Sequence, residues 1–561
     1  MRLAAAFGAL GVAVALATCA DQTPFVLPGA DGYTVLAHSA LPAHSLRVRR
    51  PPAGLCEAEG TLSWSGYLDV DLDKLYEHER DEDEAERGSQ GGARGRVGPT
   101  PPPRRGTVEH FYFWAFESRN DRASDPVTLW LNGGPGCSSF TGLLMELGPC
   151  NAVRPRDGIP GTAWNRWSWN ANASMVFLDQ PVGVGFSYAS WKDASREDAP
   201  PSRILDTPAA ARDVSAFLHL LAAHAENRVV SLQQDTPASP PRLPHFHLAG
   251  ESYGGRYVPL IASQVLKDNK RATAHPEHGL HPLPLASVLI GNGITSPLHQ
   301  NKAYIEYACT NSSGHAPFLD TRTCAKMREK WPVCEQLVRR CNEHCGNASD
   351  RTARCKTAAT FCSRALEAPW DATNSCAWTA PPRVLTAAVY DWAHKPEYDE
   401  ETWVAAFLND PRTRAQLGLD ARGAGDMRDG RFAGCSDRVF ADFATTGDGA
   451  RDSMWAVVDL LANGVRVLSY SGTRDFICNF IGNAMWINDL DWPGRDGYRA
   501  APLEPWYADD SASPAGYFRT YANVTYATVE GAGHFVPLAQ PRNAQTMFRR
   551  WVHGAAPGRL D

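Results

Sequence analysis

One short motif contains the residue types that nucleophilic catalysis requires. Gly250-Glu-Ser-Tyr-Gly254 is a G-x-S-x-G sequence with Ser252 at its centre. It follows an apolar run at 246–249 and precedes a helical pattern with apolar residues on one face. Strand, sharp turn and helix form the context of a nucleophile elbow, which exposes a serine hydroxyl at the end of a strand. Because the chain contains 47 glycines, the motif alone is a weak signal, and its flanks are what predict a nucleophile at Ser252.

A serine hydroxyl needs a base to activate it and a third group to orient that base. In hydrolases with this elbow, the acid and then the histidine follow the serine along the chain. Asp475 comes just after an apolar run at 465–470, and His534 comes just after another at 524–529. A single Asp or His in such a loop is usually a turn former. The joint placement of all three residues at the ends of expected parallel strands predicts a Ser252–Asp475–His534 triad.

Acyl transfer also requires two backbone N–H groups that point at the developing oxyanion. The residue after the nucleophile, Tyr253, is expected to supply one of them. The glycine-rich segment Asn132-Gly-Gly-Pro-Gly136 follows an apolar run at 127–131 and is expected to supply the other from Gly134. The alternative interpretation of this segment is an ordinary turn.

The elements that must position these residues follow an α/β rhythm. Short apolar runs alternate with helical patterns, of which the clearest begins at Thr207-Pro208, with Thr as the N-cap and Pro at the first position. This alternation predicts an α/β fold with a mostly parallel central sheet flanked by helices. From about 297 to 434 the rhythm fades, and the cysteines there predict an inserted, disulfide-stapled helical cap. The expected strands lie at 62–70, 108–117, 127–131, 175–178, 246–249, 285–290, 465–470 and 524–529.

Several longer blocks resemble the serine carboxypeptidase family. They are Trp130-Leu-Asn-Gly-Gly-Pro-Gly-Cys-Ser-Ser139, Phe177-Leu-Asp-Gln-Pro181, Gly250-Glu-Ser-Tyr-Gly-Gly-Arg-Tyr-Val-Pro259, Ile290-Gly-Asn-Gly293, Asp475-Phe-Ile-Cys-Asn479 and Gly533-His-Phe-Val-Pro537. The resemblance extends from about Gly66 to Gly554. It implies an α/β-hydrolase fold and the release of C-terminal amino acids from peptides and proteins, without a metal or an organic cofactor.

The resemblance also implies roles that spacing does not reveal. Asn132, Gly133, Glu146 and Glu251 would bind the free carboxylate of the substrate, with Trp130 supporting them. Two carboxyl groups held close together cannot both ionise cheaply, so one would stay protonated and donate to the substrate. Without the resemblance, Glu146 would be interpreted as an exposed helix residue. The resemblance places a substrate pocket at Trp130, Thr141, Met145, Cys478 and Phe535.

Two positions depart from the family pattern at the substrate subsites. Gly449 stands where a family member has a Trp that lines the subsite before the scissile bond. Phe535 stands where that member has a Met, and with Met145 and Thr141 it is expected to make the pocket for the departing residue apolar.

The 14 cysteines indicate an oxidising compartment. Eight of them lie between Cys309 and Cys376, without histidines at the spacing of a zinc finger, which favours disulfides over zinc. By resemblance, Cys478 is a free thiol in the pocket, and the bridges are Cys137–Cys435, Cys309–Cys324 and Cys334–Cys362. Cys355 would pair with Cys341 or Cys345, the other of which would pair with Cys376, and Cys56 would pair with Cys150. Four sequons add weak support for the secretory route, at Asn172, Asn311, Asn347 and Asn523.

The N-terminus has the pattern of a signal peptide over 1–20, with Arg2 before an apolar run and small residues after it. Residues 21–50 end in Arg49-Arg50 and are interpreted as a short pro-segment, followed by the carboxypeptidase domain at 51–561. Residues 73–105 are charged and then rich in Gly and Pro, which predicts a disordered loop inside a hairpin. No other stretch approaches membrane length, so the mature chain is expected to lack a membrane span.

A net charge of −7 argues against binding to nucleic acid. His275, His278 and His281 recur at every third position, but Pro276 and Pro282 favour a loop without fixed ligand geometry, so no metal site is predicted there.

Two other functions remain open from the motifs. An acyltransferase would use the same acyl-enzyme, and a protective binding subunit for other lumenal enzymes would need no catalysis, although the apparently complete triad disfavours it. By resemblance, a vacuolar or lysosome-like lumen is favoured over the extracellular space.

Overall fold

A computed structural model describes residues 25–28, 32–57, 61–78, 106–193, 195–196, 200–226, 244–343, 347–373, 387–394, 398–419, 430–509 and 511–556. The predicted signal peptide at 1–20 lies outside the described residues, as do residues 79–105 and the cysteines at 345 and 376.

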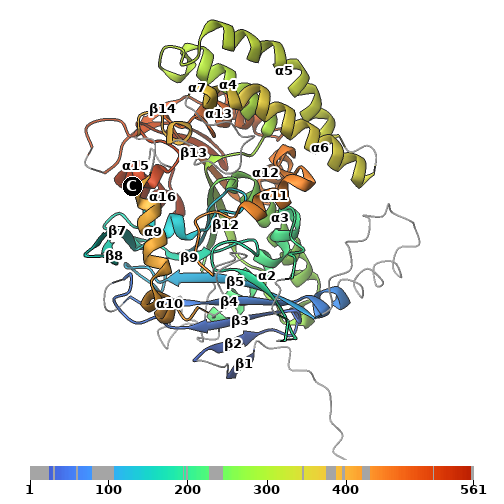
Figure 1. The fold of residues 1–561 in the computed structure, drawn as a ribbon, viewed down its shortest axis with the longest axis vertical. Coiled ribbons are helices and arrows are strands. Elements are labelled where there is room, and N and C mark those ends of the chain that lie inside the picture. Colours follow the sequence, from blue (N-terminus) through green and yellow to red (C-terminus); the bar gives the residue numbers. More distant parts are fainter. Residues whose placement is uncertain are drawn as a thin grey trace, which may run out of the picture.

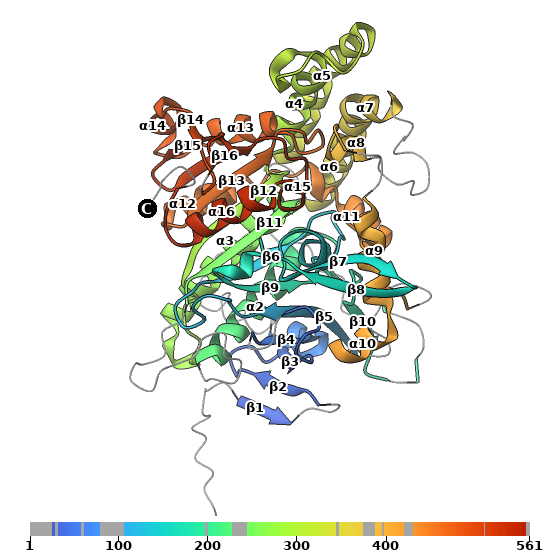
Figure 2. The same ribbon diagram turned by 90° about the vertical axis from the view of Figure 1, so that its left-hand side faces the viewer.

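A single twisted sheet of 14 strands organises the described part of the chain, in the order β1-β2-β3-β4-β5-β9-β6-β11-β12-β13-β16-β15-β14, with β10 beside β5. Figure 2 shows these strands stacked from β1 at the bottom to β14 at the top. The strands from β9 to β16 in this order are parallel, whereas those on both sides are antiparallel. The strands are β1 Phe25–Pro28, β2 Thr34–Ala37, β3 His44–Arg49, β4 Ser63–Asp71, β5 Thr107–Phe116, β6 Val127–Leu131, β9 Ser174–Leu178, β10 Tyr188–Trp191, β11 Phe246–Ser252, β12 Leu285–Gly293, β13 Arg466–Gly472, β14 Glu504–Trp506, β15 Gly516–Tyr521 and β16 Val524–Val529, while β7 Cys150–Arg156 and β8 Ile159–Trp164 form a separate hairpin.

The central strands are apolar throughout because both of their faces are covered. Successive side chains of β6 enter different cores: Leu129 and Leu131 pack into one, and Trp130 into the other. The first core contains the apolar faces of α2 and α3, and the second contains those of α9 and α16. The predicted mostly parallel sheet with helices on both faces is thus confirmed.

The longer helices are α2 Thr207–Glu226, α3 Gly254–Ala274, α4 Pro297–Cys309, α5 Thr321–Asn342, α6 Ala348–Cys362, α9 Asp399–Asn409, α11 Asp437–Thr446, α12 Met454–Ala462, α13 Phe480–Asn488 and α16 Pro541–Val552. The shorter ones are α7 Ala368–Thr373, α8 Ala387–Tyr390, α10 Pro411–Leu417, α14 Arg495–Ala500 and α15 Val536–Ala539, with single turns at η1 Gly142–Glu146, η2 Trp169–Ala171, η3 Pro276–His278, η4 Asn311–Ser313, η5 Ser363–Glu367 and η6 Asp448–Ala450.

The predicted cap at 297–434 contains two groups of helices that occupy different places. In Figure 1, α5 and α6 project at the top, whereas α9 and α10 run down the side of the molecule toward β4 and β5. Leu417 O, at the end of α10, accepts hydrogen bonds from Ser65 Oγ on β4 and Tyr112 Oη on β5, at 2.9 and 3.0 Å. The second group therefore braces the sheet and belongs to the body of the domain.

The segment interpreted as a pro-segment is built into the sheet. β2 pairs with β3, and β3 pairs with β4 along its whole length. Leu36, Leu46 and Val48 are buried in the first core. Cleavage near Arg49-Arg50 stays a prediction. Loss of residues 21–50 would remove the three strands β1, β2 and β3 and expose this part of the core.

The expected loop at 73–105 also begins differently. Residues 72–78 are helical, and the Asp73 carboxylate accepts hydrogen bonds from Gly106 N at 3.0 and 3.1 Å, which joins the two ends of the insertion. The prediction of a disordered loop is therefore wrong for residues 73–78, because these residues are helical and the Asp73 carboxylate is hydrogen-bonded to the other end of the insertion.

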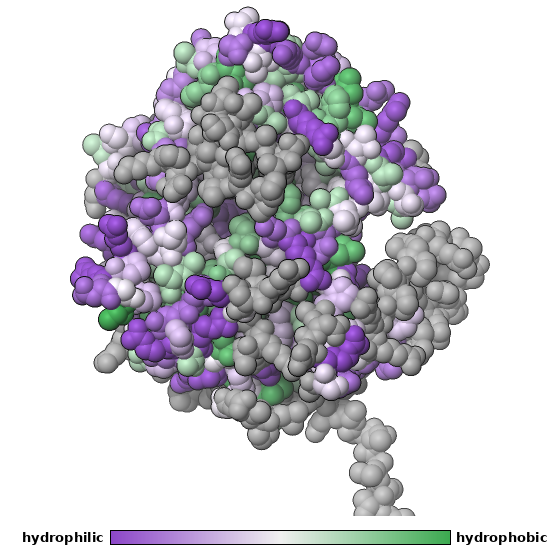
Figure 3. All heavy atoms as spheres, in the orientation of Figure 1, coloured by the Kyte–Doolittle hydropathy of each residue, from purple (hydrophilic) through white to green (hydrophobic). Residues whose placement is uncertain are grey.

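The surface drawn in Figure 3 intersperses hydrophilic and hydrophobic residues. Among the described helices, none combines the length and apolar character needed to cross a membrane.

Replacement of Leu46 by Ala tests whether β3 is part of the core. We expect Leu46→Ala to lower the free energy of unfolding by about 2–5 kcal/mol, because it leaves a cavity beneath the sheet. The measurement is denaturant unfolding, with Ser45→Ala on the opposite, half-buried face as the control. A loss no larger than that of the control would show that residues 32–50 contribute little to stability.

Candidate active site

The predicted nucleophile lies at a sharp turn between β11 and α3. Ser252 is the last residue of β11, and its backbone adopts a φ of 59°, which is rare for residues other than glycine. A side chain on Gly250 would collide with the neighbouring strand β6, since its Cβ would lie 2.7 Å from Leu131 O. The turn therefore has the strained backbone and the small neighbours expected of a nucleophile elbow.

The predicted base and acid contact each other directly. His534 Nδ1 lies 2.8 Å from Asp475 Oδ2, and both side chains are buried. The same oxygen accepts a 2.7 Å hydrogen bond from Asn292 Nδ2, and the other carboxylate oxygen accepts from Cys478 N at 3.2 Å. Since carboxylate oxygens accept hydrogen bonds, this arrangement favours the ring proton on Nδ1 and leaves a lone pair on Nε2, as the predicted base requires.

Ser252 belongs to the same cluster. The Ser252 hydroxyl lies beside the Cys478 thiol, where it acts to lower the pKa of that thiol. The ligand atoms of Asp475, Cys478 and His534 all lie within 4.8 Å of one another. Burial and the Asp475 carboxylate raise the pKa of the Cys478 thiol well above its usual value, so this free cysteine is neutral and a poor nucleophile.

The glycine-rich loop after β6 lies directly against the elbow. A Cβ on Gly133 would be 2.4 Å from Tyr253 N and 2.7 Å from Ser252 Cβ, so only glycine allows this approach. Gly134 follows with a φ of 108°, which also favours glycine. Among the described residues, neither Gly134 N nor Tyr253 N donates to a protein acceptor, which leaves both amides available for an oxyanion.

Two carboxyl groups are buried together beside the elbow. Asn132 Nδ2 donates to Glu251 Oε1 at 2.7 Å and lies 3.5 Å from Glu146 Oε1. The Asn132 side chain is itself oriented, because its Oδ1 accepts from Trp130 Nε1 at 2.8 Å and from Gly142 N at 3.0 Å. Burial raises the pKa of both Glu146 and Glu251, and the proximity of Glu146 raises that of Glu251 further. The pair therefore keeps protons that an exposed pair would lose.

The predicted pocket residues surround the same region. Met145 and Glu146 share the single turn η1, which Thr141 precedes, and Trp130 and Met145 are buried. Phe535 follows His534, and its ring packs against Tyr390 and Tyr398, with centroids 5.7 and 5.1 Å away.

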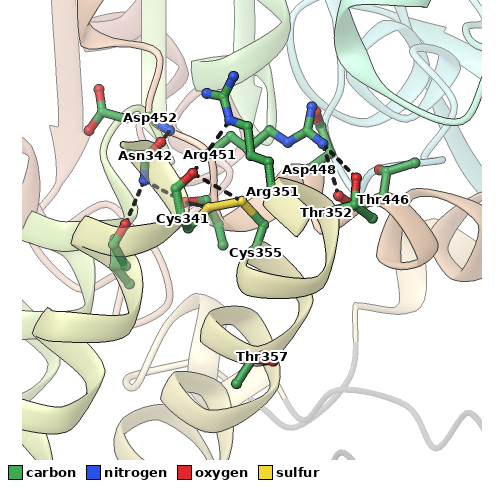
Figure 4. The surroundings of a disulfide bond; sticks show 12 residues. Cys341, Asn342, Arg351, Thr352, Cys355, Thr357, Thr446, Asp448, Arg451 and Asp452 are labelled. Carbon is green, nitrogen blue, oxygen red and sulfur yellow. Dashed lines mark hydrogen bonds between the residues drawn. A yellow bond between two sulfur atoms is a disulfide. The ribbon is translucent and has the colours of Figure 1, made fainter. Parts of the chain in front are cut away.

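Disulfides hold the segments around the site. The structure contains Cys137–Cys435, Cys309–Cys324 and Cys334–Cys362, together with Cys56–Cys150 and Cys341–Cys355. Figure 4 shows Cys341–Cys355, beside which Asn342 donates to Ala450 O at 3.0 Å and accepts from Asp452 N at 2.8 Å. Of the four sequons, Asn311 and Asn347 are exposed, and Asn172 and Asn523 are partly exposed.

Residues 104–554 match the serine carboxypeptidase family. The chain belongs to this family of serine-type hydrolases. A vacuolar serine-type carboxypeptidase of Saccharomyces cerevisiae is 35% identical over 455 residues, which are 80% of this chain and 77% of that protein. Carboxypeptidase Y of Candida albicans is 34% identical over 519 residues, 92% of this chain and 77% of its own length.

The fold comparison agrees with the family assignment. The crystal structure of a prohormone-processing carboxypeptidase from Saccharomyces cerevisiae is 21% identical and superposes with a TM-score of 0.65, covering 89% of this chain and 94% of its own. The serine carboxypeptidase thus has the predicted α/β-hydrolase fold.

Two positioning residues of this serine carboxypeptidase had no assigned role in the sequence. Asn292 orients Asp475, and its only signal was the Ile290-Gly-Asn-Gly293 block. Asp448 accepts hydrogen bonds from Tyr253 Oη at 2.7 Å, from Arg256 Nε and Nη2 at 2.7 and 2.8 Å, and from Thr207 Oγ1 at 2.5 Å. Burial acts to raise the pKa of Asp448, but the Arg256 guanidinium lowers it below the usual value. Arg256 is therefore engaged by Asp448 and is not free to bind a substrate carboxylate.

The hydrogen bond to Asp448 anchors the side chain of Tyr253, whose backbone amide is a predicted oxyanion donor. Tyr253→Phe removes the contact to Asp448, and we expect kcat to fall by roughly 10- to 100-fold for all substrates, because a misplaced donor stabilises the transition state less well. Thr207→Val removes another donor to the same Asp448 oxygen and is the matched control, with kcat expected within about twofold of wild type.

Steady-state kinetics and the affinity of a peptide aldehyde, whose hemiacetal adduct with the serine resembles the tetrahedral intermediate, check this prediction. A change in KM alone, or an equal effect of both substitutions, would contradict a positioning role for the Tyr253–Asp448 contact.

Proposed function

We propose that this chain is a serine carboxypeptidase that releases C-terminal amino acids from peptides and proteins through an acyl-enzyme. One observation carries the proposal: Glu251 precedes Ser252 on β11 and is hydrogen-bonded to Asn132 in a buried pair with Glu146. The proposed carboxylate-binding group is thus adjacent to the predicted nucleophile. Such an arrangement suits a substrate whose scissile bond lies next to a free C-terminus.

In the first half of the reaction, Ser252 Oγ attacks the carbonyl carbon of the last peptide bond, and His534 Nε2 takes the hydroxyl proton. Asp475 keeps His534 in the correct orientation and stabilises its charged form. The amides of Gly134 and Tyr253 donate to the oxyanion. The tetrahedral species then collapses, His534 returns the proton to the amine, and the C-terminal amino acid departs. Water, deprotonated by His534, attacks the ester and releases the shortened peptide.

Recognition of the substrate depends on protons in the carboxyl pair. Protonated Glu146 and Glu251, together with Asn132, donate hydrogen bonds to the terminal carboxylate, whereas the ionised pair repels it. Because burial raises the pKa of both groups, the binding form is fully present at acidic pH and is lost as pH rises through the raised pKa values. We therefore propose that the peptidase activity is favoured at acidic pH.

The five disulfides among the described residues are typical of a protein that folds in an oxidising compartment. The acidic preference proposed above supports a vacuolar lumen for this chain, and so does the vacuolar location stated in the name of one relative.

Removal of the nucleophile is the first test. Ser252→Ala should lower kcat by about 10⁴-fold or more while leaving the melting temperature intact, because the nucleophile and its base act as a unit. Ser263→Ala, on α3 beyond the elbow, removes a hydrogen bond to Asp459 and is the control that should keep its activity. Mass spectrometry of digested peptides, with and without a serine-directed organophosphate, measures the product. A Ser252→Ala enzyme with more than a tenth of wild-type activity would refute the triad, and transfer to an added alcohol without hydrolysis would favour an acyltransferase.

The pH dependence of KM tests the carboxyl pair. For a peptide with a free C-terminus, KM should rise with pH as the protons of Glu146 and Glu251 are lost. The C-terminal amide of the same peptide lacks the repelled charge, so its KM should change little. Glu251→Gln should flatten the profile for the free peptide, since an amide cannot ionise. Parallel KM profiles for the two wild-type substrates would show that another group anchors the carboxylate.

A further inference from the structure

A cluster of potential metal ligands lies at the end of α3 opposite to the elbow. The helix begins at Gly254 beside Ser252 and ends at Ala274, after which the turn η3 spans Pro276–His278. His275 Nδ1 lies 3.0 Å from Glu277 Oε1, and His278 Nε2 lies 3.9 Å from the same oxygen. All three ligand atoms lie within 4.8 Å of one another.

These separations fit a tetrahedral ion. Zinc binds imidazole nitrogens and carboxylate oxygens at about 2.0–2.2 Å, so two ligands of one tetrahedral ion lie roughly 3.3–3.5 Å apart. The two distances to Glu277 Oε1 bracket that value. Rotation of the two imidazole rings out of their stacked arrangement would bring all three atoms into the coordination shell of one ion, with a fourth position left to water.

Backbone hydrogen bonds fix the turn that carries these side chains, where the sequence predicted a loop without fixed ligand geometry. His275 N donates to Arg271 O at 2.9 Å, His278 N to His275 O at 3.0 Å and Gly279 N to Pro276 O at 3.1 Å. Pro276 occupies the first position of the turn, where its missing N–H costs nothing. Gly279 ends the turn with a φ of 68°, and its carbonyl oxygen lies 3.3 Å from His38 Nε2.

The side chains are also accessible to solvent, and the two imidazole rings lie close together. The three ligand residues are 57–59% exposed, and the imidazole rings of His275 and His278 stack with centroids 5.3 Å apart and an angle of 14° between planes. A cation at this place would lie at the C-terminal end of α3, where the helix dipole favours positive charge.

We propose that His275, Glu277 and His278 form a surface site for a divalent transition metal, with zinc as the ion that two imidazoles and one carboxylate best suit. Bound zinc would fix the turn that links α3 to β12. The site is separate from the catalytic residues and would stabilise the enzyme without a part in the reaction.

Titration of the full metal-free enzyme with zinc chloride, followed by calorimetry and by the melting temperature, tests the proposal. We expect one site that raises the melting temperature. Glu277→Gln and the double variant His275→Ala/His278→Ala should weaken binding by about tenfold or more and abolish the shift. His281→Ala, in the same exposed segment, is the matched control and should bind zinc like wild type.

Zinc could instead bind the buried group of Asp475, Cys478 and His534, whose ligand atoms also converge. Cys478→Ser separates the two sites. Binding and thermal stabilisation that persist in Cys478→Ser and disappear in His275→Ala/His278→Ala would support the surface site. No binding by wild type, binding unchanged in the double variant, or binding lost in Cys478→Ser would overturn it.

Discussion

The close approach of Gly133 to the backbone at Ser252 and Tyr253 is the constraint on which the site depends. β6 and β11 are parallel neighbours, so the loops that follow them leave the sheet side by side. With a hydrogen atom as its side chain, Gly133 can contact the elbow, and the amide of Gly134 then shares a region with that of Tyr253. The same contact brings Asn132 to Glu251. The proposed oxyanion hole and the proposed carboxylate-binding residues therefore depend on the same packing of two turns.

The buried carboxyl groups of the site differ in the donors that surround them. Asp475 accepts hydrogen bonds from Asn292 and Cys478 N and also contacts His534. These interactions offset the free-energy cost of burying an ionised carboxylate. Glu146 and Glu251 are buried as deeply, yet they share the amide of Asn132 and lie beside each other, and Glu146 Oε2 has no partner among the described residues. The first arrangement suits a permanent negative charge, and the second suits groups that exchange protons with the medium.

The insertion between β12 and β13 contributes to the site through connections far apart in sequence. Cys435 ties the segment before α11 to the glycine-rich loop at Cys137. Asn342, next to the Cys341–Cys355 bridge, holds the backbone at Ala450 and Asp452, two and four residues from Asp448. Asp448 in turn holds Tyr253 and Arg256. The insertion is therefore a brace for the elbow as well as a cover over the sheet.

Local sequence patterns were sufficient for the central strands and for the proposed triad, because parallel strands bring the residues that follow them to one edge. The glutamate pair needed the family resemblance, since nothing local distinguishes Glu146 from an exposed helix residue. Only the tertiary structure decided which groups donate hydrogen bonds to the buried carboxylates of Asp448 and Asp475. Along the chain, 195 positions separate Tyr253 from Asp448, and 183 separate Asn292 from Asp475. It also decided that residues 32–50 form strands of the sheet and that the turn at Pro276 brings two histidines close together. These outcomes depend on contacts between distant segments and on backbone hydrogen bonds, which residue types and spacing do not encode individually.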